Sequence, residues 1–454
     1  MRFHFVAAVL IFTAALARAE SAPRLTPPDP IADRLVAEAL EKTPEIAAAR
    51  ATTEAAKGRV EPASAPPDPT FSFTYQNEGR AFSLGDQQGS FLGLMATQPI
   101  LWPGKLSLAG QAAGSTARQV EIETTGRVAR TIEARVRSSW YDFVLAHATE
   151  HLLDHHTETA RQIEETVRQR YAAGLTIQQD VLRADVELAK LEEARIAQHA
   201  AIVSAAAGIN RLTGRAQDAP LDPHADLPPV DAIPAAAEVI SVVNGRSPEL
   251  AAAQQAIETG RIGTEIARKN FYPDFSVSAG SMYRNGFEMG PMWQVGVGIS
   301  LPVWTDRRQQ NQLTAARADV AARNAERDVV AQQLELRTRE RLAQLEAAQR
   351  IVTLYSEKVI PLDELSFESA RASYTAGKVP FITVLEALDS LYGDRTILLQ
   401  RTAEAAKWRV AIDEASLEPT PLTGATSMPS SARPTATQTT PVPSAGTTAM
   451  TSMR

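Results

Sequence analysis

The sequence contains no cysteine, which excludes disulfides, thiolate metal ligands, cysteine nucleophiles and an acylated N-terminal cysteine. Aromatic residues make up only 6% of the chain, and beyond the first residues no uncharged apolar run approaches the roughly 20 residues of a membrane-spanning helix. The net charge of −7 and the dispersed basic residues argue against a nucleic-acid partner. Hydrolase, metalloprotease and phosphate-loop motifs are also absent, so we expect neither enzyme activity nor a cofactor.

Residues 1–19 have the pattern of an export signal. Arg2 supplies the positive start, a mostly apolar run follows to Leu16, and Ala17-Arg18-Ala19 fits a small-x-small cleavage site. A short membrane anchor is the alternative, but the run is too short to span a bilayer. We expect cleavage after Ala19 and an exported mature protein.

The chain repeats itself. Four segment pairs recur in the same order at an offset of 203 or 204 residues: Thr43–Ala49 with Ser247–Ala253, Pro69–Phe73 with Pro273–Val277, Tyr171–Gly174 with Tyr374–Gly377, and Val181–Ala184 with Val384–Ala387. Such a unit is far longer than the roughly 20–50 residues of solenoid repeats. We therefore predict two halves of one design, 20–215 and 235–416, joined by a Pro-rich linker at 216–234. Residues 417–454 are Pro, Thr, Ser, Ala and Gly-rich and are predicted to be disordered.

The sequence of each half predicts mostly helix. The segment 105–171 has no proline, and its length as a helix is about 100 Å. Gly174 marks a reversal into a return helix at 177–212, and 306–374 with 381–414 repeats the arrangement, with Pro361 as an expected kink. A shorter helix is expected to begin at Asp29 or Pro30 and to break and restart at Thr43-Pro44-Glu45, and another is expected at 235–270. Thr43 and Thr176 are the expected N-caps, and 61–69 is rich in Pro and small residues.

Period-two alternation interrupts the helices in both halves. Residues 71–76 with 91–98, and 275–279 with 293–301, alternate apolar residues with Ser, Thr, Gln and Gly, which predicts two β-hairpins. In a bilayer, open sheet edges are not tolerated and four strands cannot close, but three copies would supply about twelve strands. Trp102 and Trp304 follow the strands, where an interfacial aromatic girdle would lie. Two soluble hairpins are the alternative.

Taken together, these features resemble the TolC family of outer-membrane efflux channels over about residues 30–416. The specific carriers are the twofold element order, Gln98-Pro99 and Leu301-Pro302 at the strand ends, and the two Tyr-x-Ala-Gly turns. The resemblance implies a homotrimer with a shared 12-stranded β-barrel in the outer membrane and an α-helical periplasmic tunnel. It also implies a periplasmic adaptor and an inner-membrane pump as partners. The stretch Met292–Pro302 looks closest to the heavy-metal branch of the family.

The resemblance also assigns roles to residues at the two turns. The residues that correspond to the family's adaptor-docking positions are Gly174, Leu175, Gly377 and Lys378. Asp180 and Tyr374 correspond to residues of the latch that keeps the periplasmic aperture closed. The family's latch arginine is not matched, because Val379 stands in its place beside Lys378. The family's ring of two aspartates at the pore constriction falls on Thr383 and Glu386, and a threefold ring of Glu386 carboxylates would favour cations.

Two groups of candidate metal ligands lie outside this pattern. His147, His151 and His155 recur at one-turn spacing on a helix, although an exposed polar stripe explains them as well. Met282, Met289 and Met292 are soft ligands that suit copper or silver, or else ordinary loop methionines. The favoured function is a passive outer-membrane exit duct for metal ions or small toxic compounds. The alternatives are a periplasmic coiled-coil scaffold and a metal-binding protein without channel activity.

Overall fold

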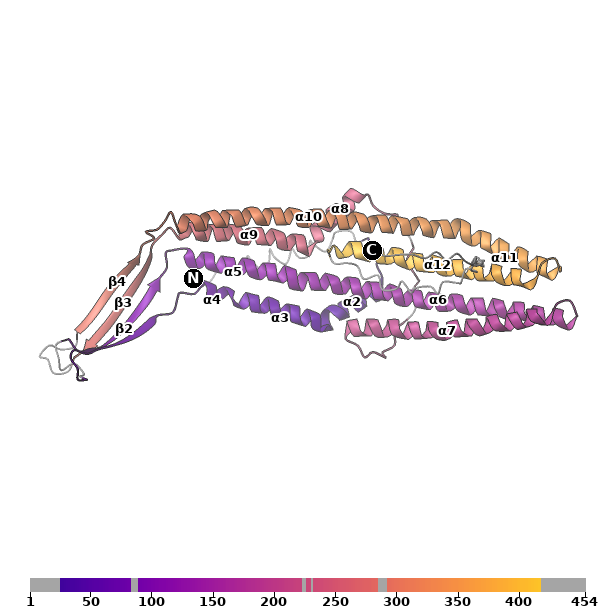
Figure 1. The fold of residues 1–454 in the computed structure, drawn as a ribbon, viewed down its shortest axis with the longest axis horizontal. Helices are drawn as coiled ribbons and strands as arrows, with labels where there is room; N and C mark the ends of the chain where they lie inside the picture. The colour runs from indigo at the N-terminus through magenta and orange to yellow at the C-terminus, as the bar shows by residue number, and fades with distance from the viewer. Residues whose placement is uncertain (1–24, 83–88, 223–225, 230–231, 285–291, 418–454) are drawn as a thin grey trace, which may run out of the picture. The chain divides into compact units, whose positions relative to one another are not determined.

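The computed structural model describes residues 25–82, 89–222, 226–229, 232–284 and 292–417. The predicted export signal and the predicted disordered tail lie outside these ranges, as does Met289. Figure 1 shows a small sheet followed by long helices that run side by side. Within the described ranges, no helix combines the length and the apolar character that a membrane-crossing helix needs.

The first half follows the predicted order. Its elements are α2 (Pro30–Lys42), α3 (Pro44–Gly58), α4 (Val60–Ser64), β1 (Thr70–Gln76), β2 (Phe91–Ile100), α5 (Lys105–Glu121), the π-helical turn η1 (Ile122–Gly126), α6 (Arg127–Ala172) and α7 (Gln178–Thr213). The helical run from Lys105 to Ala172 is continuous and is about 100 Å long. Gly214 adopts a left-handed conformation and ends α7, as glycine readily does.

The second half repeats this order. Its elements are α8 (Ala236–Arg246), α9 (Pro248–Lys269), β3 (Asp274–Tyr283), β4 (Met292–Ser300), α10 (Gln309–Leu354), the π-helical turn η2 (Tyr355–Val359), α11 (Ile360–Thr375) and α12 (Phe381–Glu414). Pro361 lies in the first turn of α11, where its missing N–H is tolerated, and the helix is interrupted just before it by η2.

The two predicted N-caps differ in outcome: Thr43 occupies the N-cap position of α3 without a side-chain cap bond, and the Thr176 prediction was wrong. Thr43 precedes α3, but its hydroxyl lies 2.6 Å from the Ala39 carbonyl oxygen and 2.8 Å from that of Leu212, so it ties α2 to α7 instead of capping α3. The N-cap of α7 is Ile177, and the Thr176 hydroxyl donates to Asp180. Residues 60–64 form the short helix α4, at the start of the stretch rich in Pro and small residues.

The four strands form one antiparallel sheet in the order β1-β2-β3-β4, and not two separate hairpins. The central pair, β2 with β3, joins the two halves of the chain, with Ala96 opposite Ala279. Because side chains alternate across a sheet, this register places most of the large apolar residues of the four strands on one face, with Phe91 and three methionines on the other.

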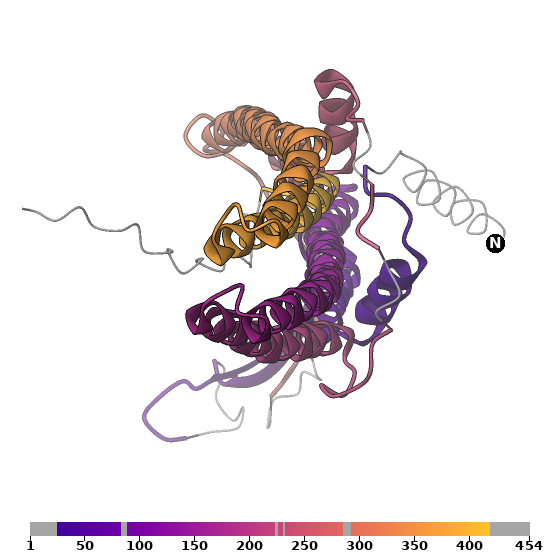
Figure 2. The same cartoon turned by 90° about the vertical axis from the view of Figure 1, so that its right-hand side faces the viewer.

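The long helices pack as neighbours in a layer. Helix α6 contacts α7 and α12, α10 contacts α9 and α12, and α5 contacts α9. Viewed along their length, these helices lie side by side in a curved layer (Figure 2). Trp140 and Phe143 of α6 are fully buried in the largest core cluster, between α2, α7 and α12, and the Trp140 ring nitrogen donates to Asp29 at 2.7 Å.

Candidate functional site

The two predicted reversals have the same backbone geometry. At the end of α6, the N–H of Gly174 donates to Tyr171 and that of Leu175 to Arg170, and Gly174 has a φ of 70°. At the end of α11, Gly377 donates to Tyr374 and Lys378 to Ser373, and Gly377 has a φ of 72°. Both are Schellman motifs, in which a left-handed glycine lets two N–H groups satisfy the last helical carbonyls. The same sequence feature therefore produces the same turn in each half.

Arg170 ties the first turn to the second. Its Nη1 atom donates to the carbonyl oxygen of Thr375 at 2.7 Å, and its guanidinium lies 4.9 Å from the centroid of the Tyr374 ring. The sequence interpretation missed this residue, since it looked for the arginine on the second turn, at Val379. The only signal was a basic residue in the last turn of α6, which is common at helix C-termini.

Tyr374 is held by its ring. The side chain is buried, and the ring lies 5.5 Å from that of Phe381, centroid to centroid. Its hydroxyl has no hydrogen-bond partner among the described residues. The core around it includes Val167, Phe367, Val384 and Leu388, which closes the tips of α6, α7, α11 and α12 against water.

The other latch residues show no bond to the Tyr374 side chain among the described residues. Asp180 is half-buried and accepts from the Thr176 hydroxyl within its own turn, and the described residues show no bond from it to Tyr374 or Lys378. Leu175 and Lys378 are exposed, which leaves both turns accessible to a partner. The latch between Asp180 and Tyr374 stays a prediction.

Acidic residues follow one side of α12 beyond the tip. Thr383 is half-buried and Glu386 is exposed, and Asp389 lies one turn further on. Desolvation between α7 and α12, aided by the negative charges of Glu187 and Glu386, raises the pKa of Asp389 to about 6, while Lys190 opposes this shift. Sequence spacing alone did not identify Asp389, because its acidic neighbour Glu187 comes from another helix.

A second carboxyl pair lies between α11 and α12. Asp363 and Asp394 face each other, and desolvation followed by this contact raises the pKa of Asp363 to about 6. One Asp363 oxygen, Oδ2, is buried without a donor, so a proton on either carboxyl would supply the missing hydrogen bond. Asp363 lies in the first turn of α11, just after the π-helical turn η2, and Asp394 lies on α12.

The three predicted histidine ligands make separate contacts. His147 packs edge-on against Phe143 and lies 3.4 Å from Glu150, His151 is exposed, and the Nδ1 atom of His155 bonds the Tyr392 hydroxyl. In the described part of the chain, no group of three or more His, Cys, Asp or Glu side chains is arranged to hold a metal ion.

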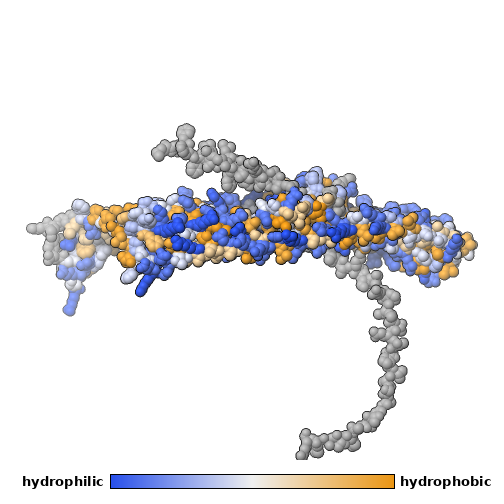
Figure 3. Space-filling model, turned by 90° about the horizontal axis from the view of Figure 1, so that it is seen from above, coloured by the Kyte–Doolittle hydropathy of each residue, from blue (hydrophilic) through white to orange (hydrophobic). Residues whose placement is uncertain are grey.

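The strands join the helices through a polar and aromatic junction. The Trp102 ring stacks on Tyr272 at 5.0 Å and lies 6.0 Å from Phe275. The Lys105 Nζ atom lies 2.8 Å from both carboxylate oxygens of Asp274. Trp304 is 71% exposed, and its position at a membrane interface stays a prediction. Figure 3 shows hydrophobic surface where the strands give way to the long helices.

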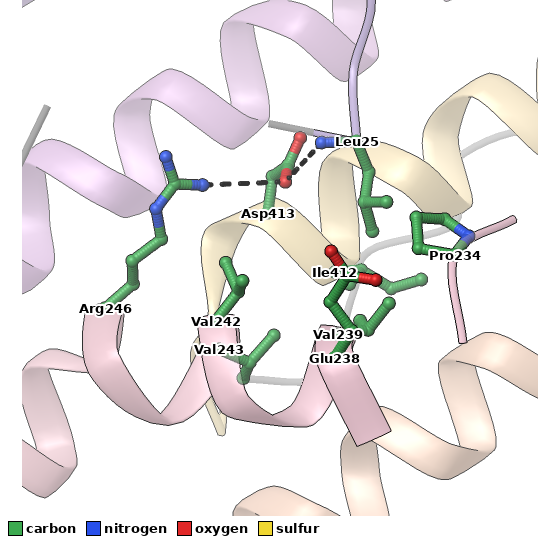
Figure 4. Close-up of a pocket in the computed structure, with 9 residues that line it drawn as sticks. All are labelled: Leu25, Pro234, Glu238, Val239, Val242, Val243, Arg246, Ile412 and Asp413. Carbon is green, nitrogen blue, oxygen red and sulfur yellow. Dashed lines mark hydrogen bonds and ion pairs between the residues drawn. The ribbon is translucent and has the colours of Figure 1, made fainter. Parts of the chain in front are cut away.

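A cavity of about 90 Å³ lies where α8 meets the end of α12 (Figure 4). Asp413 accepts from the Leu25 N–H at 3.0 Å and lies 3.8 Å from Arg246. Apart from Glu238, the rest of the lining is apolar and comes from Val239, Val242 and Ile412 among others. These contacts fasten the segment before α2 to the end of α12, which points to a structural role.

Comparisons with known proteins agree with this geometry. The family model described as outer membrane efflux protein matches residues 35–215 and 239–416, one match in each half. The chain therefore belongs to the outer membrane efflux protein family, and it is an efflux channel component and not an enzyme.

Two curated relatives are similar to the chain. It is 28% identical over 301 residues to the cobalt-zinc-cadmium resistance protein CzcC of Cupriavidus metallidurans. The matched region covers 65% of this chain and 70% of that protein. It is 27% identical over 223 residues to the fusaric acid resistance protein FusA of Burkholderia cepacia. This match covers 46% of this chain and 40% of that protein.

Solved structures share the fold. The outer membrane protein VceC of Vibrio cholerae has a TM-score of 0.68 at 22% identity, covering 85% of this chain and 95% of its own. CusC has a TM-score of 0.67 at 16% identity, and the match covers 87% of this chain and 96% of the CusC chain. At these identities the likeness establishes the shared fold.

Proposed function

We propose that three copies of the chain form the passive outer-membrane exit duct of an efflux system, together with a periplasmic adaptor and an inner-membrane pump. The exposed apolar face of the sheet is the observation that carries this proposal. That face bears Phe71 and Phe73 of β1, Leu94 of β2, Val277 of β3, and Trp293, Val295, Val297 and Ile299 of β4, all of them exposed. A contiguous exposed patch of this kind marks a membrane or protein interface.

The opposite face of the sheet suits water. It bears Thr70, Ser72, Thr74, Ser276, Ser278, Gly296 and Gly298, among others. Alternation between lipid-facing apolar residues and lumen-facing small or polar residues is the pattern of a transmembrane β-barrel. Within the described sheet, β1 and β4 are edge strands, and three such sheets joined edge to edge give about twelve strands, inside the range of known barrels.

The helical tip is where the duct would open. The two Schellman turns, the Arg170 tie and the buried Tyr374 ring support this proposal, because they hold the four helix ends of one chain together. Exposed Leu175 and Lys378 beside the turns would be available to the adaptor. Outward movement of the helix pairs would break the Arg170 contacts and bring Glu386 and Asp389 to the margin of the opening.

Metal cations are the cargo that these carboxylates favour. Acidic residues that line a constriction attract cations, and Glu386 and Asp389 lie one turn apart near the tip. The similarity to a cobalt-zinc-cadmium resistance protein supports the same cargo. Small toxic organic compounds are the second candidate, supported by the similarity to a fusaric acid resistance protein.

A matched pair of substitutions tests the membrane face. Val277 and Ser278 are neighbours on β3 and point to opposite faces of the sheet. A lysine on the lipid face of a barrel costs about 2–4 kcal/mol at the bilayer midplane, whereas a lumen lysine is tolerated. We expect Val277→Lys to reduce the amount of heat-modifiable trimer in outer membranes, and Ser278→Lys to leave it unchanged. Equal effects, or a wild-type protein that is monomeric in buffer without detergent, would refute the proposal.

A further inference from the structure

Three methionines gather on the polar face of the sheet. Met282 of β3 is paired directly with Met292 of β4, and Met95 of β2 is paired with Gly280, two residues from Met282 on the same face. Directly opposed side chains have Cβ atoms about 4.5–5.5 Å apart, and diagonal ones remain within reach of long side chains. The three thioethers therefore belong to one small block of the sheet.

Glycines leave space between these side chains. Within the block, Gly93 faces Met282, and Gly280 lies between Met95 and Gln294. A Cβ atom on Gly280 would lie 3.2 Å from that of Met95 and 2.6 Å from the Leu94 carbonyl oxygen, closer than real contacts allow. With no side chain at Gly280, the Met95 side chain can extend over β3.

A contact between strands that are not neighbours shows that Met95 does so. The Gln294 amide nitrogen on β4 donates to the Met95 sulfur at 3.5 Å, across the intervening strand β3. The sulfur therefore lies above the strand that carries Met282, with its lone pairs available to a polar group. A methionine whose sulfur accepts a hydrogen bond on an open face is not filling a core.

We propose that Met95, Met282 and Met292 form a thioether site for a soft monovalent metal cation of the Cu(I) class. Thioether sulfur is a soft ligand that selects such ions over harder divalent cations. Flexible, unbranched side chains separated by glycine can converge on one ion without moving the backbone. The proposal deepens the proposed function, on which it rests for the cargo: this face would line the duct, and the site would be a binding step for the cation on its way out.

Silver(I) is the probe, because it has the ligand preference of Cu(I) without its redox chemistry. We expect titration calorimetry of the full-length protein in detergent, in chloride-free buffer, to show one silver ion bound per chain. The methyl resonances of ¹³C-methyl methionine should shift at Met95, Met282 and Met292. The triple Met→Leu variant should lose the binding, and Met428→Leu, which alters a methionine beyond the described residues, should retain it. Zinc should not bind at these sulfurs.

The possible results test the proposed silver site and the proposed duct separately. Silver binding that survives in the triple leucine variant, or an absence of binding in the wild type, would overturn the site. Leucine is close to methionine in size, so the triple variant should keep the trimer and its conductance in planar bilayers, which shows that lost binding is not lost folding. A wild type that binds silver but does not conduct would keep the site and refute the duct.

Discussion

The guanidinium of Arg170 lies over the ring of Tyr374 at 4.9 Å and also holds the carbonyl oxygen of Thr375. This relationship joins the last turn of α6 in the first half to the last turn of α11 in the second. The residue that corresponds to Arg170 in the second half is Ser373, which cannot make the reciprocal contact. The two halves are therefore alike in their turns but unequal in the tie between them.

Arg170→Ala should loosen the closed tip. It removes a hydrogen bond from a charged donor, worth about 1.5–3 kcal/mol, and a cation–π contact worth about 0.5–1 kcal/mol. We expect a higher single-channel conductance in planar bilayers, with Arg170→Lys intermediate because lysine keeps the charge but loses the planar fork. Arg371→Ala is the control, since Arg371 is exposed and pairs with Glu368 on its own helix. Equal conductance in the Arg170 and Arg371 variants would exclude the tie as a gate element.

Tyr374 should act through its ring and not through its hydroxyl. Because the hydroxyl has no partner among the described residues, we expect Tyr374→Phe to conduct like the wild type. Tyr374→Ala removes the ring that packs on Phe381 and under Arg170, so it should raise conductance. A rise in Tyr374→Phe, enlarged by Asp180→Ala, would show instead that the hydroxyl takes part in the predicted latch.

Asp363 should make the protein less stable as the pH rises from about 4 to about 6. The pKa of Asp363 is raised to about 6 in the folded protein from an ordinary value of 3.8, so the unfolded chain loses its proton first over this range. The folded state then binds more protons than the unfolded state, and the free energy of unfolding falls with increasing pH. Asp363→Asn should remove this contribution, which thermal unfolding at several pH values would detect.

The control for this prediction is Asp319→Asn, on the exposed surface of α10. We expect it to keep the wild-type pH dependence. If Asp363→Asn also keeps it, the two carboxyls do not share a proton in the folded protein.

His156 should have the opposite pH dependence. Desolvation lowers the pKa of this buried imidazole from 6.5 to about 4, although Glu187 opposes the shift. The unfolded chain therefore gains a proton first as the pH falls from about 6.5 to about 4, and stability is lost over that range. His156→Phe keeps a ring to stack on Tyr392, where the imidazole ring lies at 4.1 Å, and cannot be protonated. We expect its melting temperature to fall less between pH 6.5 and pH 4.5 than that of the wild type, and an unchanged pH dependence would count against the assignment.

Local sequence signals predicted most of the helices, the strands and the turns. Gly174 and Gly377 end helices because a left-handed residue is needed there, and alternation at 275–279 and 293–301 marks strands because the strand period is two. Asp29 and Ser247 also precede a Pro-initiated helix and cap it with their side chains, although the sequence analysis named Thr43 and Thr176 as caps and not these two residues. Each of these features depends on a few adjacent residues, so the sequence displays it directly.

What the sequence did not predict depends on residues far apart in the chain. The pairing of β2 with β3, the bond from Thr43 to Leu212 and the contact of Arg170 with the second turn join segments separated by more than 150 residues. Asp363 and Asp394 become a pair only because α11 and α12 pack together. No local periodicity records such contacts, and a threonine before a helix can equally well cap it or bond elsewhere.

Asp29 links the start of the fold to its largest core, so its removal should be costly. One carboxylate oxygen accepts from the N–H groups of Ile31 and Ala32, and the other accepts from the Trp140 ring nitrogen. Loss of an N-cap costs about 0.5–2 kcal/mol. A buried donor left without its partner costs about 1–3 kcal/mol more.

We therefore expect Asp29→Ala to lower the melting temperature and to shift the tryptophan fluorescence spectrum. Asp29→Asn is the matched control, because its amide oxygen can still cap α2 and its size is the same. It should lie between the wild type and the alanine variant, since one oxygen cannot serve both the cap and the Trp140 ring as well as a carboxylate does. If alanine and asparagine prove equally stable, the carboxylate does not join the α2 cap to the core through Trp140.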